Sequence, residues 1–272
     1  HIRVETEKVF DAKLGKIKEK KSEILIFPRF HQLNVIQRLK EAVVTEDVGH
    51  NYLIQHTTGS GKSLSIGWLA HLLTSLYRTT TDTKRMFDTI IVITDRRVLD
   101  KQIRQTIKQL EQVKGVVNAV DKNSQQLKEF LEDGKSLIIT TVQKFPVISE
   151  EIAKLKSKSF GVIIDEVHSS QSGETSKHLK KSLSKSVLDE FQEGEGKEDL
   201  TALDQLILDE IITRGSQSHI SYFGFSGTPK NKTLEIFGRK NDDGQFLPFD
   251  SYSMKQSIAE GFTLDVLQNY TT

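Results

Sequence analysis

The chain of 272 residues contains no cysteine, four prolines, two methionines and one tryptophan. Without cysteine it can form no disulfide, no thiolate zinc site and no cysteine nucleophile, and a reducing cytosol is allowed. Its apolar runs are all far shorter than the ~20 residues of a membrane-spanning helix, so we expect no membrane partner. Because the net charge is only +1, any contact with nucleic acid must come from a local surface.

Charged residues make up 28% of the chain and hydrophobic residues 36%, which is typical of a folded domain with a substantial core. The sequence begins with His1 and shows no signal-peptide pattern, so we expect a piece of a longer protein. Residues 1–40 hold 10 Lys and Arg against 5 Asp and Glu. We interpret residues 1–23 as a solvated, polar lead-in from a preceding domain, in preference to a nucleic-acid-binding arm.

A glycine-containing loop follows the short apolar run at residues 52–55, and a helical pattern follows the loop. This order of strand, loop and helix is the one that a phosphate-binding loop requires. Glycine can adopt backbone angles closed to other residues, so successive N–H groups can converge on phosphate oxygens. The helix start adds its positive dipole end. The predicted nucleotide-binding residues of the loop are Thr58, Gly59, Ser60, Gly61, Lys62 and Ser63.

Two side chains of the loop have specific predicted roles. Lys62 is expected to reach the terminal phosphates, and the Ser63 hydroxyl to ligate Mg²⁺. The loop departs from the G-x-x-x-x-G-K-[ST] template at one position, where His56 replaces the first glycine. Taken alone, the loop could also be a Gly-Ser turn with an incidental lysine.

Upstream of this loop, Pro28 ends an extended run and precedes a helical pattern that contains Arg29 and Gln32. The glutamine amide carries a donor and an acceptor, which match the N6–H and N7 groups of adenine. We therefore predict that Arg29 and Gln32 bind the adenine base. A glutamine that is merely solvated at a helix start is the alternative.

Unbroken apolar runs at residues 89–94, 137–141, 160–164 and 220–225 are typical of strands buried on both faces of a parallel sheet. Helical patterns, such as that of residues 64–77, separate them. The alternation predicts an α/β fold with a mostly parallel, doubly wound sheet and helices on both faces. Residues 169–219 interrupt it with an acidic stretch, and we interpret 186–199 as a mobile insertion before a helix that spans 200–211.

Two acidic residues, Asp165 and Glu166, directly follow the run at 160–164. The carboxyl ends of such strands face the ligand crevice, so we expect Lys62 and Asp165 to meet there from neighbouring strands. Asp165 would share Mg²⁺ with Ser63, and Glu166 would orient or deprotonate the attacking water. The predicted catalytic residues are therefore Lys62, Asp165 and Glu166. Two solvated carboxylates in a turn are the alternative.

Four motifs in order resemble the Q motif and motifs I, II and III of superfamily 2 helicases: Arg29-x-x-Gln32, residues 58–63, Asp165-Glu166-Val167-His168 and Ser226-Gly227-Thr228-Pro229. More narrowly, the runs at 26–32, 94–99, 140–145 and 169–173 resemble the motor (restriction) subunit of type I restriction enzymes. The resemblance extends from about residue 24 to the C-terminus. Val167, Ser169 and Ser226 depart from the family's usual residues, but none of these changes removes a phosphate or metal ligand.

The resemblance implies a RecA-like P-loop NTPase domain, with a first motor lobe at 24–237, an insertion at about 174–219 and an exit segment at 238–272 leading to a second lobe. It implies ATP and Mg²⁺ as cofactors, double-stranded DNA and the modification and specificity subunits as partners, and the bacterial cytoplasm as location. A helicase-type motor needs arginines from a second lobe, and we identify no such segment in these 272 residues. Nor do we find an Asp…Glu-x-Lys nuclease pattern ahead of Arg29, so we expect the piece alone to be nearly inactive.

The resemblance also assigns further roles. His168, Ser226, Gly227 and Thr228 would couple the γ-phosphate to the DNA track. The DNA-facing residues would be Thr94, Asp95, Arg96, Thr140, Thr141, Gln143 and Lys144, whose hydroxyl, amide and cationic groups suit phosphate contacts. Another superfamily 2 DNA or RNA helicase, or a nucleotide-binding interaction module without turnover, remains an alternative.

Overall fold

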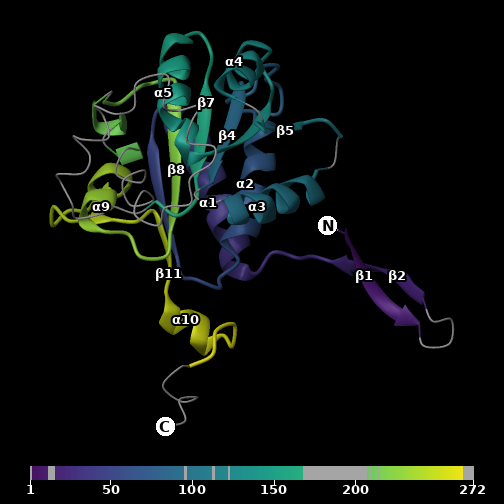
Figure 1. The fold of residues 1–272 in the computed structure, drawn as a ribbon. Helices are drawn as coiled ribbons and strands as arrows, with labels where there is room; N and C mark the ends of the chain where they lie inside the picture. The colour runs from purple at the N-terminus through teal and green to yellow at the C-terminus, as the bar shows by residue number, and fades with distance from the viewer. Residues whose placement is uncertain are drawn as a thin grey trace.

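A seven-stranded sheet forms the centre of the molecule in a computed structural model of the chain (Figure 1). The structure describes residues 2–11, 16–94, 97–111, 114–121, 123–167, 207–208, 210–213 and 215–265. The sheet strands are β3 (Asn51–His56), β4 (Thr89–Thr94), β5 (Val117–Ala119), β6 (Leu137–Thr141), β7 (Phe160–Ile164), β8 (Ile220–Ser226) and β11 (Asp250–Tyr252). Their order is β11-β3-β8-β7-β4-β6-β5, and every pairing is parallel. The predicted α/β class is confirmed.

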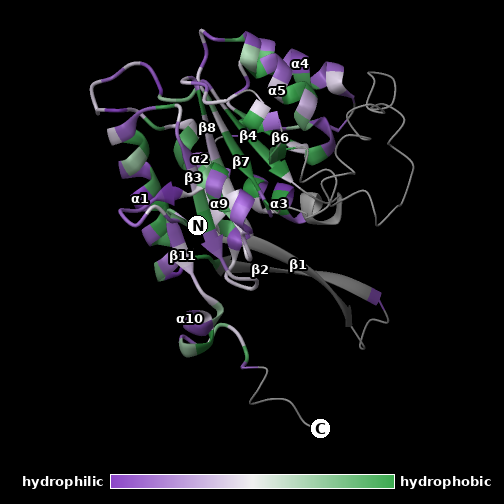
Figure 2. Cartoon of the chain, turned by 90° about the vertical axis from the view of Figure 1, so that its left-hand side faces the viewer, coloured by the Kyte–Doolittle hydropathy of each residue, from purple (hydrophilic) through white to green (hydrophobic). Residues whose placement is uncertain are grey.

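Helices cover both faces of this sheet. On one face lie α1 (Phe30–Glu46), α2 (Lys62–Thr74) and α3 (Arg97–Gln109), and on the other α4 (Ser124–Glu132), α5 (Phe145–Lys154) and α9 (Asn231–Phe237). Successive residues of a strand point to opposite faces, so Ile90 and Val92 join one core cluster while Ile91 and Ile93 join the other. The central strands β4 and β7 are therefore apolar along most of their length, as Figure 2 shows.

Smaller elements complete the fold. The turn η1 (Val142–Lys144) precedes α5, and α10 (Met254–Ala259) follows β11. β9 (Arg239–Lys240) and β10 (Phe246–Leu247) form a short antiparallel pair. β1 (Ile2–Asp11) and β2 (Lys16–Leu25) form an antiparallel hairpin that extends away from the sheet (Figure 1). None of the described helices is long and apolar enough to cross a membrane.

The structure adds to the sequence-based description in two places and corrects it in a third. The lead-in at 1–23 lies mostly within the β1–β2 hairpin, which the polar composition did not reveal. The segment 238–272, predicted as an exit segment, contributes β11 to the sheet beside β3. The strands that end at His56 and Ile164 are not neighbours, because β8 lies between β3 and β7. Most of the predicted insertion, including 186–199, lies outside the described residues.

Candidate nucleotide-binding site

The loop between β3 and α2 has the backbone geometry of a phosphate cradle. Gly59 and Gly61 have φ values of 81° and 86°, which side-chain-bearing residues rarely adopt. A Cβ atom on Gly61 would lie 2.5 Å from Gln32 Nε2, so a side chain there would force Gln32 to move. Gly61 immediately precedes α2, which directs the free N–H groups and the positive dipole end of that helix toward the loop. These features fit a bound triphosphate.

Lys62 and Glu166 meet at the carboxyl end of β8. Lys62 Nζ lies 2.8 Å from Glu166 Oε1 and donates to the His56 carbonyl at 3.3 Å. Lys62 follows β3 and Glu166 follows β7, and β8 lies between these two strands. Gly227 follows β8, and a Cβ atom on it would be 3.6 Å from Lys62 Nζ. Glu166 has a positive φ of 55°, which is uncommon for a residue other than glycine and frequent at functional sites. The predicted lysine and carboxylate thus share one site.

Ser63 and Asp165 offer the oxygen atoms that Mg²⁺ prefers. Ser63 lies in the first turn of α2, and Asp165 follows β7 and is 7% exposed. The described ranges hold no group of three or more His, Asp or Glu side chains suited to a metal. Mg²⁺ commonly needs only one or two protein oxygens, because substrate phosphates complete its coordination. The hydroxyl and carboxylate present therefore fit the predicted ion.

Gln32 contacts the phosphate loop directly. Its side-chain nitrogen donates to the carbonyls of Ser60 and Gly61, at 3.3 and 3.0 Å, and its oxygen accepts from Arg29 N at 2.8 Å. Gln32 is 1% exposed, and both of its donors are used within the protein. It could contact adenine through a donor only by giving up a loop carbonyl. The structure therefore adds a loop-supporting contact that the sequence did not predict.

The remaining predicted residues divide into several groups. Thr94 and Thr140 are fully buried, and Thr94 Oγ1 donates to the Thr140 carbonyl, so in this structure neither side chain is exposed to DNA. Burial arises because both residues lie inside the sheet, on β4 and β6. Partly exposed are Thr141, Gln143, Lys144 and Gly227, whereas Ser226 is buried and Thr228 is exposed. Asp95, Arg96 and His168 lie outside the described residues.

A buried histidine pair beside the loop was not predicted as a unit. His31 Nε2 donates to the Ser60 carbonyl at 3.0 Å, and its ring stacks on Tyr252 at 3.7 Å. Burial lowers the pKa of His31 below its ordinary value of 6.5. His56 Nε2 donates to Asp250 Oδ1 at 2.8 Å. The sequence did show that His56 replaces the template glycine. Its partner Asp250 is 194 residues away, so this contact could not be inferred without the fold.

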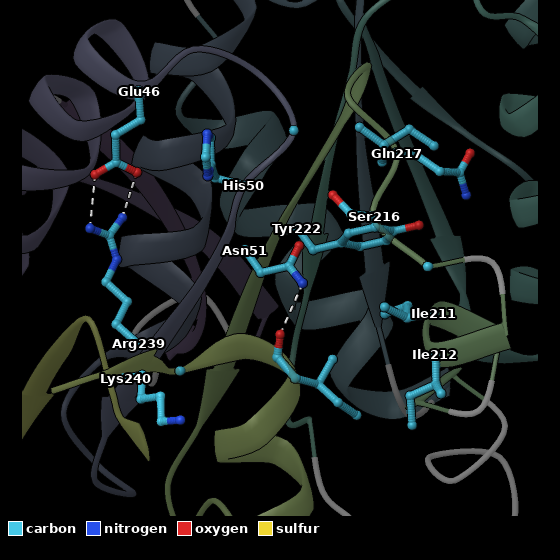
Figure 3. A pocket seen from close by; sticks show the side chains of 15 residues that line it. Glu46, His50, Asn51, Ile211, Ile212, Ser216, Gln217, Tyr222, Arg239 and Lys240 are labelled. Atoms are coloured by element: carbon cyan, nitrogen blue, oxygen red, sulfur yellow. Dashed lines mark hydrogen bonds and ion pairs between the residues drawn. The ribbon is translucent and has the colours of Figure 1, made fainter. Parts of the chain in front are cut away.

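A cavity of the described residues lies elsewhere. It measures about 680 Å³ and opens at the amino ends of β3 and β8 (Figure 3), whereas the phosphate loop follows the carboxyl end of β3. Arg239 forms a double hydrogen bond with Glu46 beside it, and this contact outweighs burial and lowers the pKa of Glu46. Asn51 donates to the Ile236 carbonyl at 2.9 Å. Both polar pairs are satisfied within the chain, and the cavity is separate from the nucleotide-binding site.

Comparison with known proteins agrees with this geometry. The family model described as SWI2/SNF2 ATPase matches residues 31–191, which include the phosphate loop and Asp165 and Glu166. The endonuclease subunit of a type I restriction enzyme from Staphylococcus saprophyticus is 26% identical over 261 residues. The HindI endonuclease subunit from Haemophilus influenzae is 28% identical over 224 residues. The resemblance to type I restriction subunits is thus confirmed.

The matches cover most of this chain but only a small part of each relative. The alignments cover 91% and 78% of this chain but 22% and 18% of those two relatives. A solved structure of a nuclease-deletion mutant of the type ISP restriction-modification enzyme LlaGI, bound to a DNA substrate mimic, matches with a TM-score of 0.51 at 13% identity. It covers 89% of this chain and 22% of that one. This match supports the RecA-like fold; the chain spans about a fifth of the length of these proteins.

Proposed function

Because the chain belongs to the SWI2/SNF2 ATPase family, we propose that it is the first motor lobe of a type I restriction enzyme that hydrolyses ATP to translocate double-stranded DNA. The observation that carries this proposal is the contact of Lys62 with Glu166, which joins the phosphate loop to the predicted catalytic carboxylate. The relatives named as type I endonuclease subunits favour the restriction enzyme over other motors of the family. Such an enzyme would act in the bacterial cytoplasm together with modification and specificity subunits.

The residues divide the chemistry between them. The loop N–H groups and Lys62 would bind the phosphates, and Ser63 and Asp165 would hold Mg²⁺, which supplies charge neutralisation at the phosphate oxygens. Glu166 would accept the proton of the attacking water. In the described state Lys62 neutralises Glu166 at 2.8 Å. A triphosphate that draws Lys62 toward its own oxygens would free this carboxylate to act as a base.

We propose that the DNA track runs along the β4 and β6 side of the same sheet edge. Gln143 and Lys144 follow β6, are partly exposed and carry groups that suit phosphate contacts. Lys144 Nζ donates to the Val120 carbonyl at 3.4 Å, so it would change partner when a phosphate approaches. Thr141 is the partly exposed hydroxyl at this end, and the buried Thr94 and Thr140 would support the backbone beneath it.

The kind of nucleic acid is tested by stimulation of ATP hydrolysis in the full-length protein. We expect duplex DNA to raise steady-state phosphate release more than single-stranded DNA or RNA of equal nucleotide concentration. The stimulation should fall as salt rises, because phosphate contacts release counterions. Preferential stimulation by RNA would assign the chain to an RNA helicase instead. ATP binding without turnover under all conditions would support an interaction module.

The role of Gln32 is tested with two nucleotides. If the amide reads adenine, Gln32→Ala should weaken ATP binding more than GTP binding, by on the order of 1–3 kcal/mol for an unpaired polar partner. If Gln32 only supports the carbonyls of Ser60 and Gly61, both nucleotides should lose affinity equally. Competition of each nucleotide against a fluorescent ATP analogue measures the difference. Equal losses would remove Gln32 from the adenine pocket.

A further inference from the structure

A buried hydrogen bond joins the start of the phosphate loop to β11, the strand that follows α9 and the β9–β10 pair. His56, fully buried at the end of β3, donates to Asp250 Oδ1 at 2.8 Å. Asp250 is 7% exposed, and its other oxygen accepts a hydrogen bond from Arg38 of α1. Arg38 also donates to the Phe249 carbonyl at 3.0 Å. One carboxylate therefore ties β11 to both the phosphate loop and α1.

The same residue also holds the lysine of the loop. The His56 carbonyl accepts from Lys62 Nζ at 3.3 Å, while its imidazole contacts Asp250. The next residue, Thr57, donates its backbone N–H to the Tyr252 carbonyl at 3.0 Å. A displacement of His56 would therefore change the surroundings of Lys62 and the pairing with β11 together. The glycine of the template could make the backbone contacts but not the contact with Asp250.

Residues 249–263, here called the C-terminal segment, touch the loop at further points. Tyr252 stacks on His31, whose Nε2 donates to the Ser60 carbonyl. Thr263 Oγ1 would lie 3.8 Å from a Cβ atom on Gly59, and the Arg29 guanidinium lies 3.9 Å from the centre of the Phe262 ring. The C-terminal segment thus lies beside the phosphate loop from His56 to Gly59.

We propose that His56 is a positioning residue that couples nucleotide binding to the order of the C-terminal segment through Asp250. This inference rests on the proposed ATP-binding function. The triphosphate would bind tightly only while His56 holds the loop against β11, and bound nucleotide would in turn stabilise the segment. Such coupling is reciprocal, because one free energy links the two events.

The test compares four variants in the full-length protein. His56→Leu removes the contact with Asp250 and keeps an apolar side chain in a buried place, whereas His56→Gln keeps a nitrogen donor. Asp250→Asn keeps an acceptor without the charge and serves as a second probe if His56→Leu does not fold. His219→Leu is the matched control. The His219 ring also makes one hydrogen bond within the chain, from Nε2 to the Ile152 carbonyl at 3.1 Å, and His219 lies far along the chain from the loop.

Affinity for a fluorescent ATP analogue is the first readout. His56→Leu should bind roughly tenfold more weakly, because it loses a hydrogen bond with a charged partner. His56→Gln should recover most of this loss, Asp250→Asn should be intermediate and His219→Leu should match the parent. At saturating ATP, kcat of His56→Leu should fall by less than the affinity, since the positioning is needed for binding rather than for the chemical step.

Hydrogen exchange of the C-terminal segment is the second readout. Nucleotide should slow exchange at residues 249–263 in the parent and in His56→Gln, and should have little effect in His56→Leu. Parental affinity of His56→Leu, equal protection in all variants, or an equal loss in His219→Leu would each overturn the inference. Lys62→Ala separates the two proposals. If that variant binds ATP as the parent does, the proposed function fails; if it loses ATP while His56→Leu keeps it, only the coupling fails.

Discussion

Glu166→Gln in the full-length protein is expected to bind ATP with Mg²⁺ near the parental affinity and to hydrolyse it about 10²–10⁴-fold more slowly. The amide keeps the size of the side chain but cannot accept a proton from water. It also loses the ion pair with Lys62 Nζ, which lies 2.8 Å from Glu166 Oε1, so Lys62 stays available for phosphate. Single-turnover hydrolysis and binding of a fluorescent ATP analogue measure the two effects separately.

Lys62→Ala is the counterpart that should lose tight binding itself. Its ammonium is the cation that the sequence assigns to the terminal phosphates, and alanine supplies no donor in its place. A parental hydrolysis rate in Glu166→Gln would show that the assigned base is wrong. A loss of ATP binding in Glu166→Gln equal to that in Lys62→Ala would show that Glu166 supports binding rather than the chemical step.

The 272-residue chain, made alone, should bind ATP weakly and hydrolyse it barely above background. Arginine supplied across a cleft is worth about 10³–10⁵ in rate in related phosphoryl transfers, and we identify no segment here that would supply it. The residues proposed to contact adenine and phosphate, by contrast, lie within the described residues. Steady-state phosphate release, measured with and without duplex DNA, tests this, and DNA should hardly change the rate.

The control for this prediction is the full-length protein under the same conditions, where duplex DNA should stimulate turnover. The Lys62→Ala form of the 272-residue chain measures the background that a contaminating ATPase would give. Brisk, DNA-stimulated turnover by the 272-residue chain alone would mean that it holds a complete active site. The proposal of a single motor lobe would then fail.

The parts of the fold that follow from local sequence were predictable. The strands at 89–94, 137–141 and 160–164 have the predicted bounds. A short, unbroken run of β-branched and other apolar residues is typical of a strand buried on both faces of a parallel sheet. The helix after the phosphate loop was expected at 64–77 and spans Lys62–Thr74. Lys62 and Asp165 were predicted to meet at the crevice, and in the structure Lys62 contacts Glu166, the residue after Asp165.

The parts that depend on distant pairing were not predictable. Strand order is set by which faces and edges fit in three dimensions, so the sequence placed β3 and β7 side by side although β8 separates them. β11 is three residues long and carries Asp250 and Ser251, which do not form an apolar pattern. Thr94 and Thr140 are buried by their neighbours in the sheet. The sequence alone does not show this burial, since a threonine at a strand end can be buried or exposed.

The strand order also arranges the motif residues as a line. At the carboxyl edge of the sheet stand the phosphate loop after β3, then Ser226 at the end of β8, Asp165 and Glu166 after β7, and the ends of β4 and β6. Neighbouring strands are roughly 4.8 Å apart, so the line from β3 to β6 is about 19 Å long.

Under the proposed function, energy released at one end of this line would have to reach the proposed DNA-facing end at Gln143 and Lys144. The shortest route crosses β8, β7 and β4 sideways, through hydrogen bonds such as that from Asp165 N to the Ile93 carbonyl at 3.0 Å. The sheet would then transmit force across the direction of its strands, from the proposed nucleotide site to the proposed DNA contact.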